Sequence, residues 1–199
     1  QLIAFKGSYH GNTHGSMSVS ANETKKRAFR PLLPDVDFIN LNHFTDLERI
    51  TNRTAGVILE PIQGDAGVRQ ASTEYLIALR QKCDEVGCLL IFDEIQCGMG
   101  RSGKLFAFEH SGVVPDVLTL GKALGGGLPI GAFIANRKHM TTLTEQPMLG
   151  HITTFGGNPV VTAAAWGTLE VFRDEINFDE VEQKGATLEA MLREIPEIQ

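Results

Sequence analysis

Two residues of opposite charge each stand just after a short, mainly apolar run. Asp93 follows the apolar residues 89–92, and Lys122 comes two residues after the run at 116–120. Such runs are typical of strands that are buried on both faces of a parallel sheet. In open α/β sheets, ligands bind beyond the carboxyl ends of the strands. The separation of Asp93 and Lys122 is about that of one βαβ unit, roughly 30 residues. We therefore expect both side chains at the ligand-binding edge of one sheet.

An amine and a carboxylate placed in this way could support carbonyl chemistry. A lysine whose pKa is lowered by desolvation can form a Schiff base with a carbonyl group, and the neighbours of Lys122 are small or apolar. A buried carboxylate such as Asp93 needs a cation, and a protonated pyridine nitrogen is one. Sites for pyridoxal 5'-phosphate (PLP) pair such a lysine with a partner for that nitrogen. The spacing alone leaves open a solvated lysine and a capping aspartate.

Five segments extend this interpretation through the whole chain. They are SYHGNTHG (8–15), ILEPIQGDAG (58–67), IFDEIQCGMGRSG (91–103), TLGKALGGGLPIGA (119–132) and TTFGGNP (153–159). In order and spacing they resemble the class III, fold-type-I PLP-dependent aminotransferases, the group acting on ornithine, acetylornithine and 4-aminobutyrate. The resemblance implies an α/β fold, namely a three-layer large domain around a mostly parallel central sheet.

The resemblance assigns the cofactor contacts to particular residues. It implies that Lys122 is the catalytic, PLP-bearing lysine and that Asp93 pairs with the pyridine nitrogen, which makes the ring an electron sink. Gln96 would hydrogen-bond the ring hydroxyl, and Tyr9 would stack on the ring through its flat face. His10 would contact the cofactor or substrate, or make a structural hydrogen bond instead.

A further cofactor contact is implied between two copies of the chain. By resemblance, Thr154 reaches the cofactor phosphate of the neighbouring subunit, which predicts a homodimer, and Thr153 contacts the substrate. Either threonine could instead cap the helix that follows.

Two positions depart from the family pattern at the expected substrate site. Asn12 stands where the family usually has an arginine that holds the substrate carboxylate, and an amide cannot make that bidentate charged contact. Asp65 stands where a glutamate that neutralises a second arginine is common. Both are expected substrate-binding positions, but they do not identify the amino donor. Glu60, at the end of another strand, is interpreted as a supporting group or as a structural residue.

The function implied is a ping-pong transamination. Lys122 would move the proton at the donor carbon, and the amino group, from an ornithine-, acetylornithine- or 4-aminobutyrate-like terminal amine, would pass to 2-oxoglutarate. The alternatives are an aminomutase of the glutamate-1-semialdehyde type and a non-catalytic member of the fold. A P-loop ATPase is a remote alternative: the run ending in Asp93-Glu94 fits a Walker-B strand, but the GxxxxGK[ST] loop is not found.

Composition limits the other possibilities. The chain has 199 residues, of which 42% are hydrophobic, and a net charge of −6, which disfavours a nucleic-acid partner. No run of 18 apolar residues indicates a membrane span, and no signal-peptide pattern is seen. Three cysteines without metal-ligand spacing favour reduced thiols, no metal site and a cytoplasmic location. Cys97, close to Asp93, is interpreted as a bystander.

The remaining predicted strands and helices should position the candidate site residues. We expect strands at 1–5, 38–41, 55–60 and 131–136, and helices up to about residue 20, at 46–51, 74–86, from 153 to about 173, and at 178–194. Residues 21–37 are expected to form a surface loop with a solvated basic cluster.

The resemblance implies that 1–199 is the central part of a PLP-binding large domain. Residues 175–199 would begin the connection to a C-terminal small domain, which would be missing together with an N-terminal segment.

Overall fold

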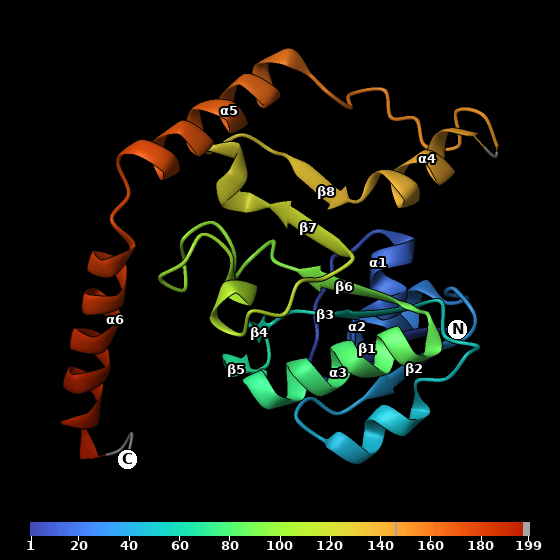
Figure 1. The fold of residues 1–199 in the computed structure, drawn as a ribbon, viewed down its shortest axis with the longest axis horizontal. Coiled ribbons are helices and arrows are strands. Elements are labelled where there is room, and N and C mark those ends of the chain that lie inside the picture. The colour runs from blue at the N-terminus through green and yellow to red at the C-terminus, as the bar shows by residue number, and fades with distance from the viewer. Residues whose placement is uncertain (146, 197–199) are drawn as a thin grey trace.

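The central feature of the fold is a six-stranded sheet. A computed structural model of the chain describes residues 1–145 and 147–196 and is shown in Figure 1. The strand order is β2-β1-β3-β6-β7-β8, and every neighbouring pair is parallel except β7 and β8. The strands are β1 (Leu2–Phe5), β2 (Val36–Ile39), β3 (Gly56–Leu59), β6 (Leu89–Asp93), β7 (Val117–Gly121) and β8 (Gly131–Ala135). The mostly parallel α/β architecture predicted from the sequence is confirmed.

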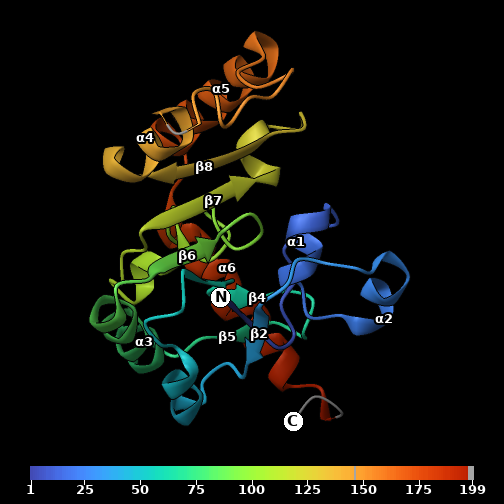
Figure 2. The ribbon, with the colours of Figure 1, turned by 90° about the vertical axis from the view of Figure 1, so that its right-hand side faces the viewer.

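Helices flank this sheet and extend away from it. They are α1 (His14–Val19), α2 (Glu23–Lys26), α3 (Thr73–Val86), α4 (Arg137–Glu145), α5 (Pro159–Asp174) and α6 (Phe178–Arg193). Short 3₁₀ segments lie at Arg27–Phe29, Phe44–Arg49, Ala107–His110 and Lys122–Gly125. Figure 2 shows α3 on one side of the sheet and α1 and α2 on the other. These elements give the sheet a helical layer on each side.

Helix α3 forms the core with one face of the sheet. Ser72 caps its first turn by accepting a hydrogen bond from the backbone N–H of Tyr75, and Gly87 ends it in the left-handed conformation. The helix predicted at 74–86 is confirmed, and Leu76, Leu79 and Cys83, at steps of three and four residues, are buried. They belong to the same core cluster as the alternate residues of β3, β6 and β7, namely Val57, Leu59, Leu90, Phe92, Leu118 and Leu120.

The opposite face of the sheet is less covered than the apolar runs predicted. The intervening residues Ile58, Ile91 and Thr119 are half-buried and line a shallow hollow of about 370 Å³ under α1. Burial on both faces was therefore the wrong prediction for this part of the chain. The reason is that α1 is only six residues long, whereas α3 has fourteen.

The segment at 21–37 is more ordered than a surface loop. It contains α2 and a 3₁₀ turn, and β2 begins two residues earlier than the strand expected at 38–41. Lys26, expected to be solvated, is 3% exposed. Its ammonium group donates to the carbonyl of Ser20, pairs with Glu23 at 3.0 Å and lies over the ring of Phe38. These partners compensate for its desolvation.

The last third of the described chain is mainly helical. Helix α4, which was not predicted, follows β8, and the predicted helices α5 and α6 form the arm seen in Figure 1. A short hairpin, β4 (Ile62–Gln63) with β5 (Arg69–Gln70), was also not predicted. The expected connection to a small domain covers residues 175–199, of which 197–199 lie outside the described residues.

A matched pair of substitutions on α3 tests its role in the core. Leu79 is fully buried, whereas Ile77 on the same helix is 43% exposed. We expect Leu79→Ala to lower the free energy of unfolding by about 2 to 5 kcal/mol, because it leaves a cavity against β6. Ile77→Ala should cost less than about 1 kcal/mol. Urea unfolding of both variants measures this difference, and equal losses would contradict the packing described here.

Candidate active site

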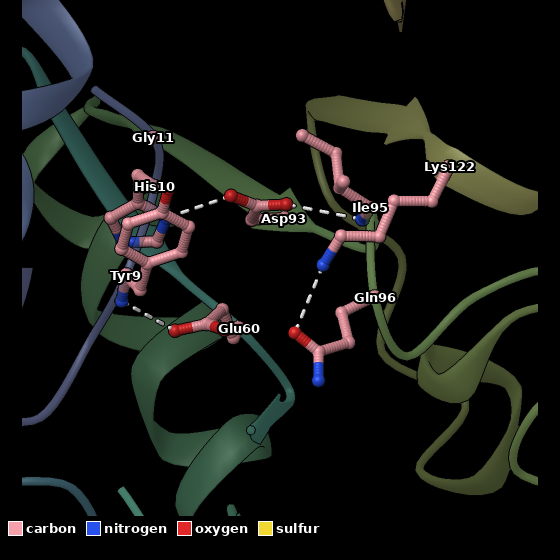
Figure 3. Close-up of a pocket in the computed structure, with 8 residues that line it drawn as sticks. All are labelled: Tyr9, His10, Gly11, Glu60, Asp93, Ile95, Gln96 and Lys122. Atoms are coloured by element: carbon pink, nitrogen blue, oxygen red, sulfur yellow. Dashed lines mark hydrogen bonds and ion pairs between the residues drawn. The ribbon is translucent and has the colours of Figure 1, made fainter. Parts of the chain in front are cut away.

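Four parallel strands bring their carboxyl ends to one cavity. Tyr9 and His10 follow β1, Glu60 follows β3, Asp93 ends β6 and Lys122 follows β7. Figure 3 shows these side chains around a cavity of about 230 Å³, which Gly11, Ile95 and Gln96 complete. Parallel pairing places the ends of these strands at one sheet edge, as expected for a ligand site in an open α/β sheet. The structure therefore brings together all five residues predicted from the sequence to contact the cofactor within one subunit.

Asp93 and His10 form a buried pair at the floor of this cavity. Nδ1 of His10 lies 2.8 Å from Oδ2 of Asp93, and both side chains are almost fully buried. The other oxygen, Oδ1, accepts a hydrogen bond from the backbone N–H of Ile95. The backbone N–H of His10 donates to Ser20 Oγ, which fixes the position of the ring. Of the two roles considered for His10, the structure thus shows a hydrogen bond that orients Asp93.

Lys122 reaches the cavity from the opposite side. Its Nζ donates to Oε1 of Gln96 at 3.0 Å, and Figure 3 shows both side chains facing Glu60 and Asp93. Lys122 is exposed and has a positive φ of 42°, an uncommon conformation for a residue other than glycine. Because Lys122 is exposed, the desolvation expected from its apolar sequence neighbours is not found in the described residues.

Gly64 keeps Gln96 within reach of Lys122. A Cβ atom at residue 64 would lie 2.4 Å from Nε2 of Gln96, far closer than van der Waals contact. Any larger residue at this position would therefore displace the amide that holds the lysine. The QGDAG segment that contains Gly64 thus contributes to the site through its small size.

Glu60 is a site residue that the sequence left open between two roles. It is buried, and its Oε2 accepts a hydrogen bond from the backbone N–H of Tyr9. Desolvation raises the pKa of this carboxyl above its ordinary value, although the hydrogen bond from Tyr9 opposes the shift. The signal in the sequence that indicated Glu60 was a polar residue at the end of an apolar strand. The structure adds that Glu60 faces the cavity and anchors Tyr9, whose ring forms one wall.

Glu94, next to Asp93, has a structural role and does not line the cavity. It is fully buried and accepts hydrogen bonds from the backbone N–H groups of Ala107 and Phe108, while desolvation raises its pKa. The second acid of the Asp-Glu pair therefore holds a loop. This placement does not support the Walker-B interpretation, in which the pair would face a nucleotide.

The predicted substrate positions lie outside the cavity. Asn12 lines a second hollow that shares Tyr9 and Gly11 with it. Asp65 is exposed in the turn between β4 and β5, and its charge contributes to the raised pKa of Glu60. The structure of the single chain therefore does not bring these two residues to the amine of Lys122.

Thr153 and Thr154 lie in another hollow, separate from the cavity and from the hollow that Asn12 lines. Both are exposed and line a hollow of about 810 Å³ between β8 and the start of α5. Neither caps that helix. The cap is Asn158, whose Oδ1 accepts from the backbone N–H groups of Val160 and Val161. The structure thus removes the simpler explanation for the two threonines. The predicted contacts of Thr154 with a neighbouring subunit and of Thr153 with the substrate stay proposals.

The three cysteines are all buried free thiols. Cys97 has its Sγ 3.7 Å from the carbonyl oxygen of Asp93, and burial raises its pKa to about 12. A thiol with so high a pKa is a poor nucleophile at neutral pH. Among the described residues, no group of three or more His, Cys, Asp or Glu side chains is arranged to hold a metal ion.

Comparison with known proteins identifies the family. The profile of the family described as Aminotransferase class-III matches residues 1–199. The chain belongs to the class-III aminotransferases. It is 45% identical over 93% of its length to the [LysW]-aminoadipate semialdehyde/glutamate semialdehyde transaminase of Sulfolobus acidocaldarius. It is 42% identical, again over 93% of its length, to the acetylornithine aminotransferase of Methanocaldococcus jannaschii.

Solved structures give the same result for the fold. Ornithine aminotransferase from Toxoplasma gondii matches 98% of the chain with a TM-score of 0.91 and 35% identity, and one structure of it has PLP at partial occupancy in the active site. The chain covers 46% of that protein, 47% of the Sulfolobus relative and 46% of the Methanocaldococcus relative. It thus spans about half the length of the relatives it matches. No helix within residues 1–145 and 147–196 is long and apolar enough to cross a membrane.

The cavity fits the cofactor that the family implies. It offers an amine at Lys122, an aromatic wall at Tyr9 and a buried carboxylate at Asp93. These groups match an aldehyde, a flat ring and a protonated ring nitrogen. One carboxylate oxygen of Asp93 faces His10 and the other Ile95, so the carboxylate keeps a fixed orientation while it retains further lone pairs. The chemistry of these groups is therefore suited to PLP.

The raised pKa of Glu60 predicts a pH-dependent stability. Because the folded state holds this proton more tightly than the unfolded state, the resulting stabilisation is complete below the ordinary pKa of 4.5 and is lost as the pH rises through the folded pKa. Glutamine keeps an acceptor for the N–H of Tyr9 but does not titrate. We therefore expect the unfolding free energy of Glu60→Gln, relative to wild type, to increase as the pH rises above 4.5. Urea unfolding across this range measures it.

The control for this measurement is Glu48→Gln, at an exposed position. Its unfolding free energy should follow that of the wild type across the pH range. A difference between Glu60→Gln and wild type that stays constant with pH would contradict the assigned effect of burial.

Proposed function

We propose that this chain forms the cofactor-binding core of a PLP-dependent aminotransferase. The enzyme moves a terminal amino group from an ornithine-, acetylornithine- or 4-aminobutyrate-like donor to 2-oxoglutarate by a ping-pong reaction. The observation that carries the proposal is the single cavity in which Lys122 faces Asp93. Family membership and the transaminase relatives support it.

Five residues of the cavity would hold the cofactor. When bound, PLP supplies an aldehyde that accepts amino groups and a ring that takes up electron density. Lys122 would bond to the aldehyde, and the carboxylate of Asp93, oriented by His10, would keep a proton on the ring nitrogen. Tyr9 would pack on the ring face, and Gln96 would hydrogen-bond the ring hydroxyl.

Lys122 is also the proton-transfer group of the proposal. Nζ of Lys122, as a free amine, would take the proton from the amine-bearing carbon of the donor and later return it. Gln96 sits 3.0 Å from Nζ and steadies the released side chain. Glu60 fixes Tyr9 through its backbone, so the wall and the amine keep their separation.

The names of the relatives support the choice of a terminal amine. One relative is named for semialdehydes carried by LysW and another for acetylornithine, and both names describe compounds whose reacting group is at the end of a chain. An aminomutase would return the amino group to the same carbon skeleton. Detection of a free aldehyde or keto-acid product, formed in step with glutamate, therefore separates the two reactions.

The assembly and location are part of the same proposal. Thr154 is exposed in a hollow apart from the cavity of its own chain, which supports a homodimer in which it reaches the cofactor phosphate of the partner. Thr153, Asn12 and Asp65 are proposed as substrate contacts completed by residues beyond this chain or by the partner subunit. The free thiols support a cytoplasmic location.

Borohydride labelling tests the cofactor assignment. Reduction makes a bond between lysine and pyridoxal permanent, so peptide mass analysis of the complete protein should find the pyridoxyl phosphate mass on Lys122. Lys122→Ala should lose both the label and the turnover. Lys104→Ala, outside the cavity, is the control and should keep both. A label on another lysine, or turnover in Lys122→Ala, would refute the assignment.

Substitution of Asp93 tests whether this carboxylate makes the cofactor ring an electron sink. Asp93→Asn should lower turnover by orders of magnitude, because a neutral amide no longer keeps the ring nitrogen protonated. The measurement is single-turnover absorbance of the cofactor with an excess of donor. Asp84→Asn, an exposed position on α3, should leave the rate unchanged. A near-normal rate in Asp93→Asn would remove Asp93 from the mechanism.

A further inference from the structure

Two buried polar atoms in the hollow under α1 lack a hydrogen-bond partner. They are Nε2 of His10 and Oγ1 of Thr119, and neither is bonded within the described residues. Both residues line this hollow, which has a volume of about 370 Å³. Buried polar groups in folded proteins are nearly always hydrogen-bonded, either to the protein or to an ordered water. The two atoms therefore indicate a binding site for a small polar molecule.

The strand register places Thr119 beside Asp93. These residues are partners in the parallel ladder of β6 and β7, so their side chains leave the same face of the sheet. His10, which follows β1, reaches the same carboxylate, with Nδ1 2.8 Å from Oδ2. His10, Asp93 and Thr119 all line the hollow. The unpaired ring nitrogen and the unpaired hydroxyl thus flank one buried carboxylate.

The chemistry of the pair decides what Nε2 of His10 requires. An ionised carboxylate only accepts hydrogen bonds, so Nδ1 must donate to Asp93. In a neutral ring Nε2 then presents a lone pair, and in a cationic ring it presents an N–H group. The hydroxyl of Thr119 can donate or accept, but it is not bonded to Nε2 directly. A water molecule can also donate and accept, so it can join the two atoms in either case.

The rest of the lining favours water at this end of the hollow. The other walls are mainly apolar and include Leu33, Ile58 and Ile91. The hydroxyl of Ser16, also in the lining, is already bonded to Thr13. The volume of the hollow is ample for a water molecule, which occupies about 30 Å³ in the liquid. A water held by His10 and Thr119 gains hydrogen bonds that the apolar walls do not offer.

We propose that an ordered water molecule bridges Nε2 of His10 and Oγ1 of Thr119, and that Thr119 is a positioning residue for Asp93. The water fixes the ring of His10, and the ring in turn fixes Oδ2 of Asp93. The positioning role rests on the proposed function, in which this carboxylate keeps a proton on the ring nitrogen of the cofactor. Thr119 acts through His10, because it is not among the described residues that line the cavity containing Lys122.

Crystallography of the complete protein with PLP bound tests the water directly. In wild type we expect an ordered water within about 3.2 Å of both Nε2 and Oγ1. Thr119→Val replaces the hydroxyl by a methyl group of similar size and should lose this water, whereas Thr119→Ser should keep it. A protein side chain bonded to Nε2 from outside residues 1–199, or no water within reach of both atoms, would overturn the proposal.

NMR of the histidine ring nitrogens gives a second readout that does not depend on turnover. The complete protein is prepared with isotopically labelled histidine, and the signals that disappear in His10→Gln are those of His10. Thr119→Val should shift the Nε2 signal of His10, and Thr119→Ser should restore it. The matched control Thr142→Val, at an exposed threonine on α4, should leave it unchanged. The same Nε2 signal in Thr119→Val and wild type would refute the bridge.

The positioning role is measured by the single-turnover rate at saturating donor. We expect Thr119→Val to lower this rate about tenfold, as for other residues that orient a catalytic group from behind. KM for the donor should change less than about twofold, because no substrate contact is removed. Thr119→Ser should restore the rate, and Thr142→Val should not alter it. A normal rate in Thr119→Val, with the water lost, would contradict the positioning role.

Failure of this proposal can be distinguished from failure of the proposed function. Absence of the bridging water with Lys122 still labelled by borohydride removes only the role of Thr119. Absence of the label in wild type removes the aminotransferase assignment and with it the positioning role. The bridging water itself is still decided in that case, by the crystal structure and the Nε2 signal of His10.

Discussion

Parallel pairing of β1, β3, β6 and β7 is the constraint on which the site depends. Because these strands run in one direction, the residues that follow them reach the same edge of the sheet. Asp93 pairs in register with Thr119, so Lys122 lies only three residues beyond the end of the shared ladder. A change of register would move the carboxylate and the amine apart. The buried core against α3 is what holds this register in place.

The buried hydrogen bond between His10 and Asp93 links the chain's first strand to its most important carboxylate. A carboxylate at this depth needs a partner with its own fixed position, and the Ser20 hydroxyl supplies that by holding the backbone of His10. Glu60 fixes Tyr9 in the same way. Two residues that line the cavity are thus held through their backbones, His10 by Ser20 after α1 and Tyr9 by Glu60 after β3.

Tyr9 lies between two hollows. It lines the cavity that contains Lys122, and it also lines a hollow of about 490 Å³ whose walls include Asn12 and Lys25. The ammonium group of Lys25 lies 5.5 Å from the centre of the Tyr9 ring. The wall that faces the amine of Lys122 is therefore also in contact with the segment around α2.

The sequence alone determined the fold class, the main strands, α3, and the placement of Asp93 and Lys122 at one edge of the sheet, because apolar runs and motif spacing are local patterns. It did not predict α4 or the β4–β5 hairpin. Only the tertiary structure decided that His10 orients Asp93, that Glu94 faces a loop and that Lys26 is buried. These outcomes depend on contacts between residues far apart in the chain. Burial and ion pairing of that kind arise when the sheet is assembled, and no local pattern encodes them.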